Sequence, residues 1–167
     1  IAWQTMKDHV IFERREVLTR SGNPYAVFTP YMRAWLEKLG DVPPHQHACD
    51  VHAGALAARP APYDHAVPSL RELGFVPTNL LTLGIAPGTL GAARLVDDFW
   101  GRMDDYDQTR NFPAVKGPSY LSVHLRFGTI SIRQLVGLAL QRKLAGSAGA
   151  AVWLAVHTTA RAAPPSR

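Results

Sequence analysis

Two serine hydroxyls stand in a short glycine–proline loop, and they are the groups of this chain best suited to hold an anion. The loop has the sequence Gly-Pro-Ser-Tyr-Leu-Ser over positions 117–122 and leads into a short segment of helical pattern. Hydroxyls and free backbone N–H groups among arginines and lysines can bind a pyrophosphate. A capped loop between two helices would have the same composition, so both interpretations stay open from the residues alone.

The charge distribution also favours an anionic ligand in this half of the chain. The 167 residues carry a net charge of +5, and positions 108–167 hold eight Lys or Arg and no Asp or Glu. Such a stretch is expected at positive potential, which attracts phosphates and polyanions. The alternative is an acid-poor surface that faces an acidic partner domain. The preceding aspartates are expected to form a solvated helix face: Asp97, Asp98, Asp104, Asp105 and Asp107.

Other residue groups indicate little chemistry. His45, His47, Cys49 and His52 have metal-ligand types, but their spacing is irregular, so we expect a polar loop and no metal site. The Gly-Thr-Leu-Gly at 88–91 opens a predicted helix but lacks a dinucleotide fingerprint. The sequence shows no serine hydrolase elbow and no paired-carboxylate site.

Composition narrows the class of protein. No apolar run reaches 18 residues, which argues against a membrane span, and no secretory leader is visible. The single cysteine excludes an internal disulfide framework and favours a reducing compartment, so we expect a cytoplasmic protein.

Most of the predicted elements are helices. Thr29 as N-cap and Pro30 as first helical residue open a helix that Gly40 ends. Further helices are predicted over 89–103, from the Ser131 capping box to Leu144, and over 148–156.

Two segments depart from this helical pattern. The apolar run His9–Phe12 predicts a buried strand. Five prolines between positions 41 and 68 predict a linker or long ordered loop. After them, Ser69 and Glu72 have capping-box spacing, but Gly74 stops that helix early.

Three motifs occur in a fixed order along the chain. Phe-Thr-Pro-Tyr stands at 28–31, a segment from Tyr106 ends in Arg-Asn-Phe-Pro-Ala at 110–114, and Leu-Ser-Val-His-Leu-Arg-Phe-Gly covers 121–128. Together they resemble the DNA photolyase/cryptochrome family, and most of all its bacterial class I cyclobutane pyrimidine dimer (deoxyribodipyrimidine) photolyases. The resemblance continues to Leu154.

The resemblance implies a mostly α fold. The chain would hold the start of the helical FAD-binding domain, preceded by the last strand and helix of an α/β antenna domain. Residues 1–40 would end the α/β domain, and 41–85 would form the interdomain linker. Residues 86–156 would form part of the FAD-binding domain, and 157–167 a disordered tail outside the family pattern.

The same resemblance implies a function and its residues. The family splits pyrimidine dimers in damaged DNA with light and reduced FAD, as a monomer without a membrane or a metal. Trp153 would be the catalytic aromatic near flavin and lesion, while Arg110 and Lys116 would face DNA. The antenna chromophore, of folate or deazaflavin type, stays undetermined. The expected FAD contacts are Tyr106, Pro118, Ser119, Tyr120, Leu121 and Ser122.

Two departures from the family pattern bear on these expectations. Pro118 and Tyr120 replace a threonine and an arginine of the family loop. After Leu154 the family's Glu-Leu-Ile-Trp-Arg helix does not follow, which predicts an internal fragment with a shifted frame or truncated gene, inactive alone. The alternatives are a cryptochrome-type blue-light photoreceptor, an inert fragment, or a non-catalytic basic DNA-binding module.

Overall fold

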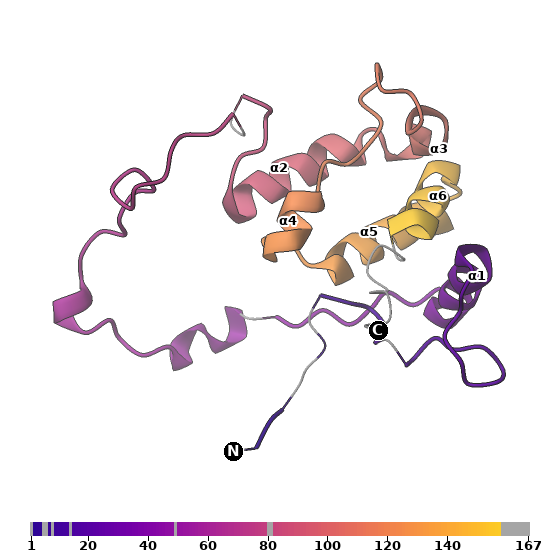
Figure 1. Ribbon diagram of the computed structural model, residues 1–167, viewed down its shortest axis with the longest axis horizontal. Coiled ribbons are helices and arrows are strands. Elements are labelled where there is room, and N and C mark those ends of the chain that lie inside the picture. The colour runs from indigo at the N-terminus through magenta and orange to yellow at the C-terminus, as the bar shows by residue number, and fades with distance from the viewer. Residues whose placement is uncertain are drawn as a thin grey trace. The chain divides into compact units, whose positions relative to one another are not determined.

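The structure is a computed structural model whose described residues form helices and no strand (Figure 1). The mostly α fold predicted from the sequence is therefore confirmed. The chain divides into two units, the first made of 1–45 with 87–167 and the second of 46–86. The described residues are 2–4, 7, 9–13, 15–48, 50–79 and 82–157.

The first unit contains all the α-helices of the described residues. Helix α6 packs against α5, α3 and the short 3-10 helix η3, while α2 packs against α4. The elements of this unit are α1 (Phe28–Leu39), α2 (Gly88–Trp100), η3 (Met103–Asp105), α3 (Tyr106–Thr109), α4 (Ser122–Phe127), α5 (Ile132–Leu144) and α6 (Ala148–His157).

Helix α1 ends where the sequence predicts and begins earlier. Gly40 follows it at φ 60°, and its N–H donates to the Leu36 carbonyl at 3.1 Å. The predicted Thr29 cap is wrong, because the helix starts at Phe28 and the preceding Val27 offers no side-chain cap. Pro30 still lies in the first turn, where a missing N–H removes no intrahelical bond.

Helices α5 and α6 agree with their predicted ranges, and α2 is shorter. The Ser131 hydroxyl accepts the Arg133 N–H at 3.2 Å and so caps α5. Helix α2 was predicted to reach Met103 but ends at Trp100, and Met103 opens the separate turn η3. Gly101, a poor helix former, lies at this boundary.

The strand predicted over His9–Phe12 is wrong. These residues form bends and irregular backbone outside any ladder. A strand needs a neighbour to pair its N–H and C=O groups, and the described residues contain none. Phe12 instead packs its ring against Trp35 of α1, with centroids 5.1 Å apart in an edge-to-face arrangement.

The second unit has two 3-10 helices, η1 (Asp50–Ala55) and η2 (Ala61–Tyr63), and none of its side chains with described burial is buried. Its capping box forms as predicted. The Ser69 N–H and hydroxyl both donate to Glu72 Oε2 at 2.7 Å, and Gly74 at φ 84° stops the turn. The interdomain role of 41–85 stays a prediction, and the predicted tail lies outside the described residues except for His157. No helix of the described part of the chain has the length and apolar character to cross a membrane.

Helix α6 lies so close to η3 that only glycine fits at position 149. A Cβ there would overlap the backbone carbonyl oxygens of Met103 and Asp104. This contact brings α6 onto the turn that leads into α3, and it buries Ala150, Trp153 and Leu154.

We predict that Gly149→Ala destabilises the protein although alanine is the better helix former. The methyl group must push backbone aside, which costs about 1–3 kcal/mol and outweighs the gain of up to about 1 kcal/mol in helix propensity. Urea unfolding followed by circular dichroism measures the change. Gly101→Ala is the matched control, because a Cβ there would meet only Asp98 O at an ordinary 3.8 Å. Equal stability of the two variants would contradict the prediction.

Candidate functional site

Three aromatic side chains from three helices meet in the core of the first unit. The rings of Phe99 and Tyr106 lie edge to face with centroids 5.8 Å apart, and Trp153 lies 6.1 Å from Phe99. All three are buried. Burial raises the pKa of the Tyr106 phenol, so this ring stays neutral at physiological pH. The structure therefore brings together Tyr106 and Trp153, the two aromatic residues expected near a flavin.

Arg110 lies against this cluster. Its guanidinium carbon is 5.8 Å from the centre of the Tyr106 ring, within the range of a cation–π contact. The side chain is half-buried. Arg110 thus contacts the Tyr106 ring and places a positive charge at the end of α3. Its expected contact with DNA stays a prediction.

The glycine–proline loop is anchored at both of its ends. A Cβ on Gly117 would come within 2.7 Å of the Thr109 carbonyl, so the loop touches the backbone of α3. Leu121, with 1% of its surface exposed, belongs to the same hydrophobic core as Tyr106 and Trp153. Ser119 is 5% exposed, whereas Pro118 and Ser122 are exposed. Of the expected FAD residues, Tyr106 and Leu121 therefore share one core, while the exposed Pro118, Tyr120 and Ser122 lie on the loop beside it.

The centre of the loop offers hydrogen-bond donors. Tyr120 has φ 56°, in the left-handed region, and Leu121 follows in the right-handed region. Successive residues of opposite hand turn their N–H groups into a concavity that binds anions. Among the described residues, no backbone carbonyl accepts from the N–H of Ser119, Tyr120 or Leu121. This donor set fits an anionic ligand such as the diphosphate of a nucleotide cofactor.

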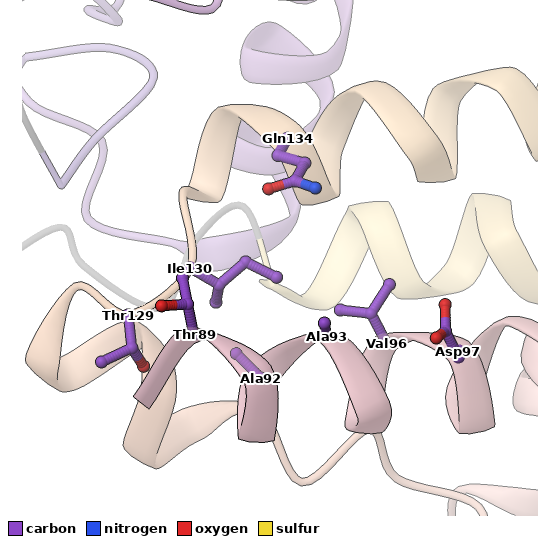
Figure 2. A pocket seen from close by; sticks show the side chains of 8 residues that line it. All are labelled: Thr89, Ala92, Ala93, Val96, Asp97, Thr129, Ile130 and Gln134. Carbon is purple, nitrogen blue, oxygen red and sulfur yellow. The ribbon is translucent and has the colours of Figure 1, made fainter. Parts of the chain in front are cut away.

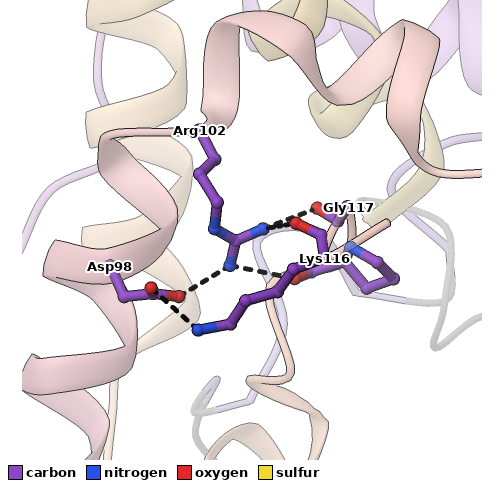
Figure 3. Close-up of polar contacts among 5 residues, drawn as sticks. Asp98, Arg102, Lys116 and Gly117 are labelled. Atoms are coloured by element: carbon purple, nitrogen blue, oxygen red, sulfur yellow. Dashed lines mark hydrogen bonds and ion pairs between the residues drawn. The ribbon is translucent and has the colours of Figure 1, made fainter. Parts of the chain in front are cut away.

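An ionic cluster holds the start of the loop, as Figure 3 shows. Asp98 on α2 accepts from Lys116 at 2.9 Å and from Arg102 at 2.7 Å. Arg102 also donates to the carbonyls of Lys116, Gly117 and Pro118. The hydrogen bonds from Lys116, and then those from Arg102, lower the pKa of the Asp98 carboxyl. Sequence reasoning missed Arg102 and Phe99, and the only signal was the i,i+4 spacing of Asp98 and Arg102.

Three cations of the acid-free stretch pair with carboxylates that lie outside it, and its positive potential stays a prediction. Lys116 pairs with Asp98, and Arg142 with Asp104 at 2.7 Å. Lys143 lies 3.9 Å from Asp41. The carboxylates come from residues distant in sequence. Of the five aspartates expected on a solvated face, all but the half-buried Asp107 are exposed, and Asp98 and Asp104 also form ion pairs.

The remaining candidates stay apart from this region. A hollow of about 180 Å³ lies between α2 and the start of α5 (Figure 2). It is too small for a dinucleotide, for which pockets of roughly 300–1,000 Å³ are usual. None of the expected site residues lines it. The residues that line it are Thr89, Ala92, Ala93, Val96, Asp97, Thr129, Ile130 and Gln134.

Within the described part of the chain, no three His, Cys, Asp or Glu residues are placed to hold a metal ion. The histidines of the predicted polar loop therefore form no metal cluster there. Cys49, the fourth member of that group, lies outside the described residues.

We predict that Asp98→Asn lowers stability by about 1 kcal/mol at neutral pH, because it leaves two cations without their carboxylate. The folded-state pKa of Asp98 lies below its unfolded value of about 3.9, so the carboxylate stabilises the fold fully above that pH. The contribution is lost as the pH falls through the folded pKa. Urea unfolding at several pH values should thus show the two proteins converging in acid.

Asp97→Asn is the matched control for this prediction. Asp97 is the exposed neighbour on α2 and makes no ion pair among the described residues. Its substitution should change stability little at any of these pH values. A difference between Asp98→Asn and the unmodified protein that stays constant from neutral to acid pH would contradict the assigned ion pair.

Comparison with known proteins agrees with the motifs. No family model matches the sequence. The chain is 32% identical over 146 residues to a deoxyribodipyrimidine photo-lyase of Halobacterium salinarum, covering 86% of this chain and 29% of that protein. It is 31% identical over 163 residues to a deoxyribodipyrimidine photo-lyase of Vibrio cholerae, covering 92% of this chain and 32% of that protein. An uncharacterised 31.6 kDa protein in the atpI 5' region of Synechococcus is 35% identical over 136 residues, covering 80% and 45%.

The chain spans less than half the length of each of these relatives. The matched region includes most of the present sequence, and the photo-lyases among the relatives come from both archaea and bacteria. The similarity is thus not confined to one motif or one lineage. The chain belongs to the deoxyribodipyrimidine photolyase family.

Proposed function

We propose that this chain supplies part of the FAD-binding domain of a class I photolyase, which repairs cyclobutane pyrimidine dimers in DNA with light. The observation that carries the proposal is the loop around the buried Ser119, whose backbone N–H groups at positions 119–121 have no backbone acceptor among the described residues. These donors suit a diphosphate. Family membership favours FAD as the ligand that carries this group, and the deoxyribodipyrimidine photo-lyases among the relatives support dimer repair.

Each group has a separate part in this proposal. Loop residues 118–122 bind the diphosphate through hydroxyls and backbone N–H groups, because the family's threonine and arginine are replaced by Pro118 and Tyr120. Tyr106 and Trp153 pack against the cofactor and exclude water, and Trp153 faces the lesion. When bound, reduced FAD supplies the light-excited electron that dimer splitting requires.

The substrate must leave the duplex to reach such a site. A dimer inside stacked DNA is inaccessible, so it has to be flipped out, which costs a few kcal/mol and less for a damaged base. Cations around the site hold the flanking phosphates. Arg110 is the better candidate for this role, because Lys116 already pairs with Asp98.

We predict that ADP shifts the amide resonances of the Ser119–Ser122 loop in the isotope-labelled chain, and that adenosine does not. ADP carries the diphosphate of FAD without the flavin, so the experiment examines the loop alone. Ser119→Ala should weaken ADP binding about tenfold, as expected for one hydrogen bond to a charged group. Shifts confined to residues outside the loop, or equal shifts with adenosine, would refute the diphosphate site.

We predict that Arg110→Gln weakens binding of the chain to duplex DNA of any sequence and lowers the salt slope of log K by about 1. Fluorescence anisotropy over a range of salt concentrations measures both. Arg33→Gln, an exposed cation on α1, is the control and should leave the slope unchanged. Equal effects of the two variants would remove Arg110 from the DNA contact. A high flavin-free affinity with a steep salt slope in the unmodified chain would favour the basic DNA-binding module instead.

A further inference from the structure

One arginine connects the aromatic cluster to the proposed diphosphate loop. The guanidinium carbon of Arg102 lies 5.5 Å from the centre of the Phe99 ring, and Phe99 contacts both Tyr106 and Trp153. The guanidinium also reaches the loop, as Figure 3 shows. Arg102 is half-buried and so has contacts with both the aromatic cluster and the loop.

The contacts of Arg102 with the loop all go to backbone. One terminal nitrogen donates to the carbonyls of Lys116 and Gly117, and the other to Pro118 O at 3.3 Å and to Asp98 at 2.7 Å. A planar guanidinium has its donors in a fixed fork, so it can orient several acceptors at once. Asp98 holds the fork in place on the side away from Phe99.

Fixing the Pro118 carbonyl also fixes the next N–H group. In a planar trans peptide, the C=O of one residue and the N–H of the next point in opposite directions. Because the Pro118 oxygen faces Arg102, the Ser119 N–H points away from it. Among the described residues, no backbone carbonyl accepts from that N–H. The arginine thereby sets the direction of this donor without contacting it.

We infer that Arg102 is a positioning residue for the diphosphate site, acting through the carbonyls of residues 116–118 on the orientation of the Ser119 N–H group. The inference rests on the proposed function of the loop. According to this inference, the loop backbone is oriented for a diphosphate before the ligand binds. Arg102 holds that backbone without contacting the ligand.

The test compares Arg102→Gln and Arg102→Lys with the unmodified chain in two measurements. The first is the affinity for ADP relative to adenosine, followed by amide resonances. The second is hydrogen exchange of the Ser119 and Tyr120 amides relative to those of α5, which needs no ligand. We expect Arg102→Gln to lower ADP affinity about tenfold, as for a loss of about 1.4 kcal/mol, and to speed exchange in the loop selectively. Arg102→Lys should rescue little, because a single ammonium cannot reproduce the fork.

Arg142→Gln is the matched control. Arg142 is likewise half-buried, pairs with Asp104, donates to the Trp100 carbonyl at 3.1 Å and stacks on the Trp100 ring, but does not touch the loop. It should lower stability without changing ADP affinity or loop exchange. Equal effects of Arg142→Gln and Arg102→Gln, full rescue by lysine, or unchanged loop exchange in Arg102→Gln would overturn the inference. If the unmodified chain does not bind ADP, the proposed function fails, while the exchange measurement still decides whether Arg102 orients the loop.

Discussion

The backbone contact between α6 and η3 at Gly149 is the constraint on which the site depends. Trp153 lies four residues further along α6, on the same face of the helix as Gly149. Tyr106 directly follows η3. The close approach at one point thus brings the indole and the phenol onto Phe99, and any side chain at position 149 would separate them. Because Gly149 has no Cβ, α6 can approach η3 closely enough for the three aromatic rings to pack together.

Two ion pairs join carboxylates that precede position 108 to cations that follow it. Asp98 and Asp104 lie on α2 and η3, whereas their partners Lys116 and Arg142 lie beyond position 108. Each pair therefore joins segments that are distant in the sequence. Because Asp98, Asp104 and Lys116 are exposed, each pair contributes little on its own, about 0–1 kcal/mol. The charge asymmetry along the sequence accordingly serves the fold of this unit as well as any ligand.

The sequence predicted helix ends correctly where a capping or helix-stopping residue lies at the end itself. Gly40 ends α1, and Ser131 caps α5, as expected. The strand over His9–Phe12 failed because an apolar run cannot show whether a pairing partner exists.

In the site, the family motifs predicted the serine loop and the two aromatic residues, but only the i,i+4 spacing from Asp98 pointed to Arg102, and nothing in the sequence indicated its contacts with the loop. The acceptors of Arg102 are mostly backbone carbonyls, which every residue carries. Such contacts therefore cannot be predicted from the residue types of the partners. The loop itself has an unusual backbone conformation at Tyr120, which has a positive φ.

Tyr120 is the only non-glycine residue with positive φ among those the structure describes. A side chain in this region costs of order 1–3 kcal/mol, and such strain persists only where the surroundings determine the backbone. Here Ser119 and Leu121 are buried on either side, and Arg102 fixes the carbonyl just before Ser119. A glycine would relieve the strain but would also let the loop adopt other conformations. The strained tyrosine and the contacts of Arg102 thus act on neighbouring parts of the loop: the tyrosine gives alternating handedness to the backbone, and Arg102 fixes the orientation of the Ser119 N–H group.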